Sequence, residues 1–410
     1  MKISLWMVLV FSLSVMVMAG CASTVDLNTY ADKIEAQLQN KNKPFGYAFV
    51  VSRPTQTSVA RAAGSARLQQ DLPELPMSVN VKYNVASVSK DITAAAVITL
   101  LNDTDIKQQD LSLDEELDAK IVDYLPYDWK PGPGVDSITF RQALKHRTGI
   151  RCTPDFVDYQ NLKQCLAQGI AVENKDLSCD KDSSGTPTGT GQPLGANDSG
   201  CYMNANYALF RVIIPVMLGK IVKPVLSPPT EEQTDQENAA LAADVYINYV
   251  NDRVFAKAGL PKIFCAPTDG AQQGLAYKLA EPNGKGTDFG DATLLCGSEG
   301  WFLSAAQMST YFQALNATDK IVAPVAAVRM RSELFGYDGV TKFTTAAGPI
   351  TRWSKAGGFP ASNNPGEINT LLVFFSNSVE VAIAINSDLP SGFSYDDAIT
   401  NAMADLLNGK

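Results

Sequence analysis

Histidine is almost absent from this sequence: His146 is the single histidine among 410 residues. A serine nucleophile that depends on a histidine base, in a Ser-His-Asp arrangement, is therefore disfavoured. One histidine also leaves no plausible set of zinc ligands, and no two cysteines form a Cys-x-x-Cys pair. We expect no metal and no cofactor. His146 ends a helical pattern before Gly149, where a structural contact with the terminal carbonyls of the helix is expected.

Basic residues are also scarce: 34 Lys and Arg stand against 43 Asp and Glu, giving a net charge of -9. Nucleic-acid surfaces need clustered Lys and Arg to replace counterions around phosphates, and the sequence has no basic stripe. We therefore expect no nucleic-acid partner. The apolar content of 45% is enough for a sizeable core, in one large domain or two closely joined ones.

Long apolar runs are missing except at the start, where residues 3–18 follow the short positive segment Met1-Lys2. The next residues, Met18-Ala19-Gly20-Cys21, resemble the lipobox of bacterial lipoproteins. This resemblance implies a signal peptide at 1–20, lipid attachment at Cys21 and a tether at 21–28. The protein would then be anchored to a membrane of the bacterial cell envelope and face the periplasm. An ordinary signal peptide with an incidental cysteine, or an uncleaved membrane helix, remains open.

The other six cysteines are an even number in a chain that carries an export signal, so disulfides are expected. Pairing of nearest neighbours is the simplest guess. It would join Cys152 to Cys165, Cys179 to Cys201, and Cys265 to Cys296.

The apolar periodicity changes twice along the chain. Strand patterns at 45–51 and 58–64, and again at 350–355, 369–375 and 379–385, flank a mainly helical middle. Helices are expected at 27–39, after Lys90, and at 140–146, 206–222, 237–258 and 395–407. This pattern predicts an α/β (α+β) fold in one domain, 29–410. Both termini would build a sheet lobe (about 29–86 plus 340–410) around an inserted helical lobe (about 87–339). Residues 151–200 fit neither pattern and carry cysteines, so they indicate a disulfide-bearing insertion.

Ser87-Val88-Ser89-Lys90 begins one of these helical runs. On a helix, Lys90 lies one turn after Ser87 on the same face, so its amine can reach the serine hydroxyl. With histidine so scarce, lysine is the obvious activator. The same tetrad pattern recurs at Ser178 and Lys181, but the surrounding composition favours a solvated loop.

Two later segments supply the other groups that an activated serine needs. Tyr202 and Asn204 would present a phenol and a carboxamide just before a helix. Lys355 and Gly357, on a strand edge, would present a cation beside small residues that let a substrate backbone approach. Copies of Tyr-x-Asn and Lys-Ala-Gly elsewhere have simpler structural explanations, such as the helix end at Lys257 to Gly259.

In this order, Ser87-x-x-Lys90, Tyr202-x-Asn204 and Lys355-Ala356-Gly357 resemble the three motifs of the serine β-lactamase and penicillin-recognising superfamily, closest to its class C-like branch. The resemblance spans roughly residues 30 to 410. Segments 111–114, 124–126, 138–149 and 297–312 also fit in order.

The resemblance implies a role for each residue. Ser87 would form an acyl-enzyme, and Lys90 and Tyr202 would share the proton transfers. Asn204 would orient the substrate amide, while Lys355, beside Gly357, would stabilise the phenolate or hold a substrate carboxylate. Backbone N–H groups of Ser87 and Gly358 would form the oxyanion hole.

Ala356 departs from the family pattern, which commonly has Thr or Ser there to help bind the substrate carboxylate. Loss of that hydrogen bond would weaken β-lactam or peptide recognition without preventing acylation. We therefore expect a serine hydrolase acting on a small-molecule or peptide acyl donor, peptidoglycan and β-lactams included. A β-lactamase or D-Ala-D-Ala peptidase, a carboxylesterase, and a non-catalytic penicillin- or peptidoglycan-binding lipoprotein all remain open.

Overall fold

The structure is a computed structural model that describes residues 25–39, 44–103, 111–150, 152, 158–170, 202–221, 231–359 and 366–410. The expected signal peptide, Cys21, the second tetrad and the Cys179–Cys201 pair lie outside these described residues. None of the described helices is long and apolar enough to cross a membrane.

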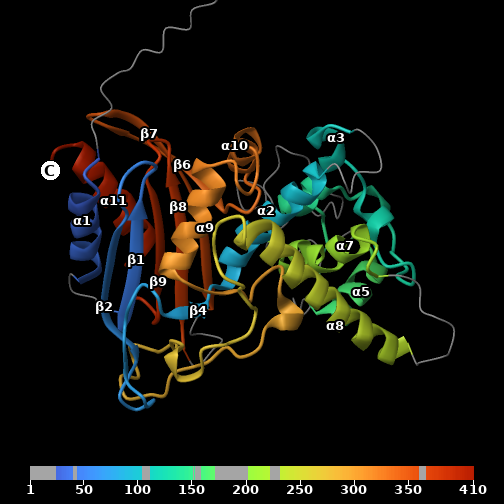
Figure 1. Ribbon diagram of the computed structural model, residues 1–410, viewed down its shortest axis with the longest axis horizontal. Helices are drawn as coiled ribbons and strands as arrows, with labels where there is room; N and C mark the ends of the chain where they lie inside the picture. The colour runs from blue at the N-terminus through green and yellow to red at the C-terminus, as the bar shows by residue number, and fades with distance from the viewer. Residues whose placement is uncertain are drawn as a thin grey trace, which may run out of the picture.

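One seven-stranded antiparallel sheet organises the fold, with strand order β3-β2-β1-β9-β8-β7-β6 (Figure 1). Its strands come from both ends of the described chain, as the sequence predicts. They are β1 (Gly46–Ser52), β2 (Val59–Arg67), β3 (Leu75–Pro76), β6 (Gly339–Thr345), β7 (Gly348–Phe359), β8 (Ile368–Phe375) and β9 (Glu380–Ile385). A separate pair joins β4 (Lys82–Asn84) to β5 (Phe302–Ser304).

Helices cover both faces of this sheet, which is why β1 and β9 are buried along their whole length. α1 (Leu27–Gln39) and α11 (Tyr395–Leu407) pack together on one face, where they meet side chains such as Ile383. α9 (Ala305–Ala317) packs on the other face, over β1 and β9 (Figure 1). α9 therefore belongs with the sheet, although it falls in the range expected for the helical lobe, because its apolar side chains are buried there.

The remaining helices lie mostly to one side of the sheet (Figure 1). They are α2 (Ser89–Asn102), α3 (Leu113–Leu117), α4 (Phe140–Leu144), α5 (Tyr159–Gln168), α6 (Asn204–Ala208), α7 (Phe210–Met217), α8 (Glu231–Val250) and α10 (Pro324–Glu333). Capping boxes start α3, α4 and α9, with Ser112, Thr139 and Ser304 as N-caps. Each cap satisfies backbone N–H groups that a helix start leaves without partners.

The fold class is confirmed, and most expected elements are present with shifted ends. The elements that the sequence analysis did not predict are β3, β4, β5, β6, α3, α5, α9 and α10. β6 is polar-rich and mostly exposed, so its hydrophobic pattern is weak. α5 lies in the segment that fitted no pattern; Asp158 caps it and Cys165 bonds to Cys152. The Cys152–Cys165 and Cys265–Cys296 disulfides match the expected pairing.

Candidate active site

Ser87 lies in a short 3-10 turn, η1 (Ala86–Val88), that runs directly into α2. Ala86 has a left-handed backbone, with φ of 46°. The turn is supported by Asn84 Oδ1, which accepts the Ala86 N–H at 2.9 Å. A left-handed residue other than glycine is uncommon, and such strain is often found at functional sites. The sharp turn places Ser87 on the wall of a cleft while α2 is buried behind it.

Lys90 is fully buried beneath Ser87. Its Nζ donates to Ser87 Oγ at 2.9 Å, to Asn204 Oδ1 at 2.7 Å and to the Ser298 carbonyl at 2.8 Å. The predicted helical spacing therefore brings the amine to the hydroxyl. These three acceptors are electrically neutral.

Tyr202 reaches Ser87 from the opposite side, and its hydroxyl donates to Ser87 Oγ at 2.7 Å. The side chain lies at the surface of the cleft, with Lys90 Nζ and Lys355 Nζ at 4.8 and 5.1 Å from its ring centre. Both amines therefore lie within cation–π distance of the tyrosine ring. The structure thus brings the predicted serine, lysine and tyrosine together around one oxygen.

His146 supports this tyrosine instead of contacting the end of its own helix. Its ring stacks on Tyr202, with ring centres 4.4 Å apart, and its Nδ1 accepts the Met203 N–H at 3.2 Å. The expected contact with terminal carbonyls is wrong, because a left-handed backbone at His146 (φ 54°) follows α4. Burial, with Lys90 and Lys355 nearby, holds the pKa of His146 well below its usual value. The ring is therefore neutral near pH 7.

Lys355 lies on β7, with 2% of its side chain exposed. Its Nζ forms an ion pair with Asp338, whose second oxygen accepts the Ala356 N–H at 2.7 Å. Sequence reasoning missed Asp338. The register of the β6–β7 hairpin would have found it. Gly339 pairs with Ser354, so the next residues outward, Asp338 and Lys355, face each other.

Gly357 and Gly358 follow on the same strand. A Cβ on Gly357 would lie 2.4 Å from the Val85 carbonyl, so the small residue lets β7 approach the chain's own η1 segment. Ala356 donates its N–H to Asp338, away from β8. Because N–H directions alternate along a strand, the Gly358 N–H faces that same edge. Gly358 and Ser87 both line the cleft.

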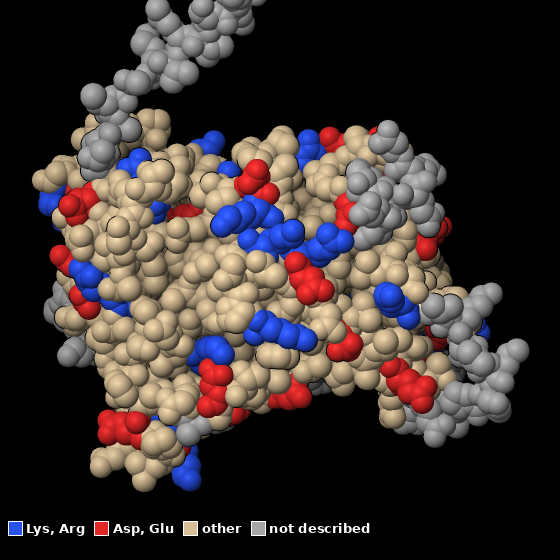
Figure 2. Space-filling model, in the orientation of Figure 1, with Lys and Arg blue, Asp and Glu red and all other residues tan. Residues whose placement is uncertain are grey.

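The cleft has a volume of about 680 Å³ and lies between β7, η1 and the ends of α4 and α10. Its charged lining residues are Lys145, Arg147, Glu333, Asp338 and Lys355. On the face shown in Figure 2, basic side chains likewise lie among acidic ones, with uncharged areas between them. Among the described residues, no group of His, Cys, Asp or Glu could hold a metal ion.

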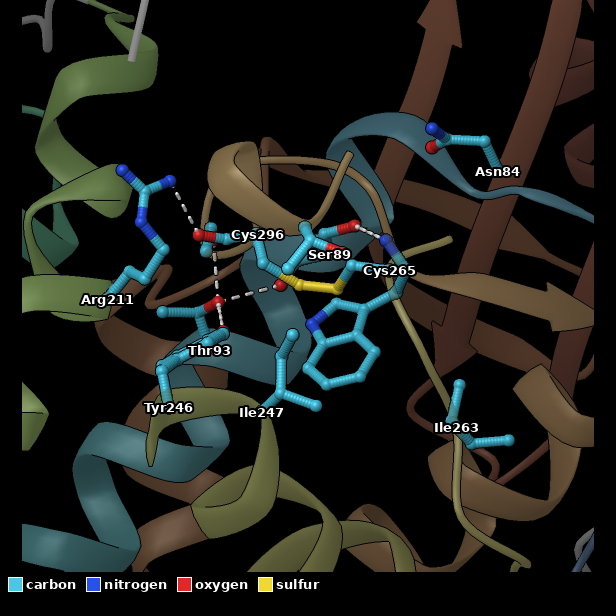
Figure 3. Close-up of a disulfide and its surroundings, with 12 residues drawn as sticks. Asn84, Ser89, Thr93, Arg211, Tyr246, Ile247, Ile263, Cys265 and Cys296 are labelled. Atoms are coloured by element: carbon cyan, nitrogen blue, oxygen red, sulfur yellow. Dashed lines mark hydrogen bonds between the residues drawn. A yellow bond between two sulfur atoms is a disulfide. The ribbon is translucent and has the colours of Figure 1, made fainter. Parts of the chain in front are cut away.

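The Cys265–Cys296 disulfide is buried behind the site and begins a segment that contacts two helices (Figure 3). Three consecutive carbonyls accept hydrogen bonds here. Arg211 on α7 donates to Cys296 O at 3.1 Å, and Thr93 on α2 donates to Gly297 O at 2.6 Å. The third is Ser298 O, which receives Lys90. The disulfide thus holds one of the lysine's acceptors in place.

Comparison with known proteins gives one family match. Residues 31–216 match the family model described as Beta-lactamase. Among curated proteins, no relative matches this chain.

The solved structures that are similar to this chain share its fold at low sequence identity. A class C beta lactamase from Rhodobacter sphaeroides is 16% identical, with a TM-score of 0.59, covering 93% of this chain and 99% of that one. A beta-lactamase/D-alanine carboxypeptidase from Yersinia pestis is 14% identical, with a TM-score of 0.60 and the same coverage of both chains. A D-amino acid amidase from Ochrobactrum anthropi SV3 is 14% identical, with a TM-score of 0.58, covering 91% and 98%. The chain has the β-lactamase/transpeptidase-like fold.

Proposed function

We propose that this protein is a serine hydrolase with Ser87 as its nucleophile. The β-lactamase/transpeptidase-like fold and the match to the Beta-lactamase family model support this proposal. One observation carries the proposal. Lys90 Nζ and the Tyr202 hydroxyl both lie within hydrogen-bond distance of Ser87 Oγ, at 2.9 and 2.7 Å, on the wall of a cleft. A nucleophile in contact with two groups that can take its proton is the arrangement that acyl transfer requires.

In the acylation step, Ser87 Oγ attacks the carbonyl carbon of an ester or amide and passes its proton to Tyr202 or Lys90. The carbonyl oxygen gains the electron pair and is stabilised by the N–H groups of Ser87 and Gly358. When the tetrahedral intermediate collapses, the bond to the leaving group breaks and that group takes the proton. Water then attacks the acyl-enzyme, and Ser87 recovers its proton as the acid product forms.

Asn204 and Lys355 assist in this proposal from two sides. Asn204 holds Lys90 through its Oδ1, and in this proposal its amide also orients a substrate amide. Lys355 lies 5.1 Å from the centre of the Tyr202 ring and would stabilise the phenolate.

The test challenges purified protein with a fluorescent penicillin, a chromogenic cephalosporin and a short-chain nitrophenyl ester, with Ser87→Ala as the control. We expect a covalent adduct on Ser87 with at least one probe and none in Ser87→Ala. Intact-protein mass spectrometry and peptide mapping measure it. If no probe forms an adduct on Ser87, the proposal is wrong.

The same probes separate the candidate activities. Turnover of the cephalosporin favours a β-lactamase, and a stable penicillin adduct without turnover favours a penicillin-binding peptidase. Ester turnover alone favours a carboxylesterase, which is the second candidate because Ala356 lacks the hydroxyl that would help bind a substrate carboxylate.

We also propose that the chain is exported and anchored through a lipid on Cys21, on the basis of the segment Met18-Ala19-Gly20-Cys21. Metabolic labelling with radioactive palmitate should mark the protein expressed in a bacterial host. Cys21→Ala should abolish the label, and an equally labelled Cys21→Ala protein would contradict the anchor.

A further inference from the structure

The carboxylate of Asp338 accepts hydrogen bonds from two donors at the β7 edge of the cleft. One carboxylate oxygen pairs with Lys355 Nζ, and the other accepts the Ala356 N–H at 2.7 Å. An ammonium and a backbone N–H that converge on the two oxygens of one carboxylate form a strong, charge-assisted arrangement. A carboxylate of this protein therefore lies where the anionic group of a bound molecule would have to bind in order to use Lys355.

The fold holds Asp338 in this position. Its backbone N–H donates to the Ser354 carbonyl at 2.9 Å, at the outer end of the β6–β7 hairpin. The side chain lines the cleft and is 37% exposed, whereas that of Lys355 is 2% exposed. The carboxylate, not the ammonium, is thus the part of this pair that an incoming molecule meets.

An anionic group at this edge has two unfavourable options. It can displace Asp338 from Lys355 and leave one carboxylate without its partner, or it can bind beside Asp338 as a like charge. A neutral group meets neither penalty. The other charges in the cleft, Lys145, Arg147 and Glu333, come from the segment after α4 and from the end of α10. Lys145 lies 3.9 Å from Glu333.

We propose, building on the serine hydrolase function above, that Asp338 determines specificity by excluding acyl donors that carry an anionic group at the β7 edge. The preferred substrates are esters or amides that are uncharged or cationic there. Asp338 acts through charge and takes no part in bond breaking.

The test compares neutral and anionic thioesters and esters of matched shape. One pair is the thioester of N-benzoylglycine with thioglycolate, whose leaving group carries a free carboxylate, and the same thioester with that carboxylate converted to a methyl ester. The two differ in charge on the leaving-group side. The other is mono-para-nitrophenyl succinate and para-nitrophenyl butyrate, which differ on the acyl side. For each pair, the ratio of kcat/KM for the neutral probe to kcat/KM for the anionic probe is measured in the wild type and in variants.

We expect the wild type to prefer the neutral member of at least one pair by about tenfold or more. Asp338→Asn should reduce this preference by about tenfold, because the amide keeps the shape and removes the charge. Asp338→Glu keeps the charge and should keep the preference. Glu333→Gln is the matched control: it removes one negative charge from the same cleft, but Glu333 pairs with Arg141. It should change the ratio by less than about threefold.

Three outcomes would overturn the inference while the hydrolase proposal stands. The wild type could turn over the anionic probes as well as the neutral ones, with the anion bound at Lys145 or Arg147. Asp338→Asn could leave the ratio unchanged, or Glu333→Gln could change it equally. If thermal melting shows that Asp338→Asn is unfolded, Asp338→Ser makes the same test. Absence of any Ser87 adduct with all four probes would instead reject the hydrolase proposal, and this inference with it.

Discussion

Lys90 and Lys355 approach the same tyrosine ring from two lobes, and their surroundings differ. Lys90 Nζ donates hydrogen bonds to a hydroxyl, an amide oxygen and a backbone carbonyl. Lys355 Nζ instead pairs with the carboxylate of Asp338. A neutral acceptor stabilises an ammonium less than an anion does, so the two amines differ in the charge of their partners. In the mechanism proposed above, Lys90 takes the proton of Ser87, whereas Lys355 acts on Tyr202.

The largest expected effect is on kcat/KM when the amine of each lysine is removed in turn. Lys90→Met should lower kcat/KM for a neutral ester by about a thousandfold, because a proton acceptor next to Ser87 is lost. Lys355→Met should lower it by about tenfold to a hundredfold, because only a favourable charge near Tyr202 is lost. Steady-state kinetics with para-nitrophenyl butyrate measures both. Equal losses would show that the two lysines do not differ in role.

A second substitution gives Lys90 the kind of partner that Lys355 has. Asn204→Asp places a carboxylate 2.7 Å from Lys90 Nζ if the geometry is kept. An opposite charge at this distance raises the pKa of a lysine by about 1 to 3 units. The rising limb of the pH–rate profile should therefore move to higher pH, and the rate at pH 7 should fall by about tenfold or more. Asn204→Ala is the control, since it removes the contact without adding charge. A profile that does not move would argue against Lys90 as a proton acceptor.

The smallest expected effect concerns how the free energy of unfolding depends on pH, through a buried carboxyl group next to the site. Asp91, the residue after Lys90, is fully buried, and burial raises its pKa to about 7. The Tyr311 hydroxyl donates to its Oδ1 at 2.6 Å, while its Oδ2 has no partner among the described residues. The folded protein therefore holds a proton that the unfolded chain releases at lower pH, and stability falls as pH rises from about 4 to 7.

Asp91→Asn should abolish this dependence. The uncharged amide should make the variant more stable than the wild type above pH 8, by up to a few kcal/mol. Below pH 5 it should be less stable by about 1 to 3 kcal/mol, because the new amide hydrogens have no partner in the space beside Oδ2. Urea unfolding at pH 5 and pH 8.5 measures both values. Wild-type and variant curves that stay parallel across this range would contradict the raised pKa.

How far the sequence predicts this site depends on the range of each contact. The approach of Lys90 to Ser87 follows from one turn of helix, so local spacing is enough to predict it. Tyr202 and Asn204 are brought in by tertiary packing, which local spacing does not predict. Their chemical types, their position before a helix and the family resemblance pointed to them. The Asp338 pair lies between these cases, because the register of a single hairpin places it. β6 was not recognised as a strand, so that register could not be used.

Charge and burial are harder to predict than the elements themselves. The sequence indicates that α2 is apolar, but it does not show that Asp91 and Lys90 are both buried at its start. His146 was assigned to a helix end from its position. Its left-handed backbone and the stacking with Tyr202 depend on a segment more than fifty residues away. Such contacts follow from how the lobes pack.

The acceptor that Ser298 provides to Lys90 belongs to the main chain, and this affects how the site can change during evolution. Its side-chain hydroxyl has no hydrogen-bond partner among the described residues. Replacement by another small residue therefore leaves the carbonyl in place, held by the disulfide two residues earlier and by the Thr93 contact at Gly297. The side chain at position 298 can therefore change without loss of the backbone carbonyl that accepts the Lys90 hydrogen bond. The absence of a particular side chain there in a related protein would say nothing about whether that protein's lysine is held in the same way.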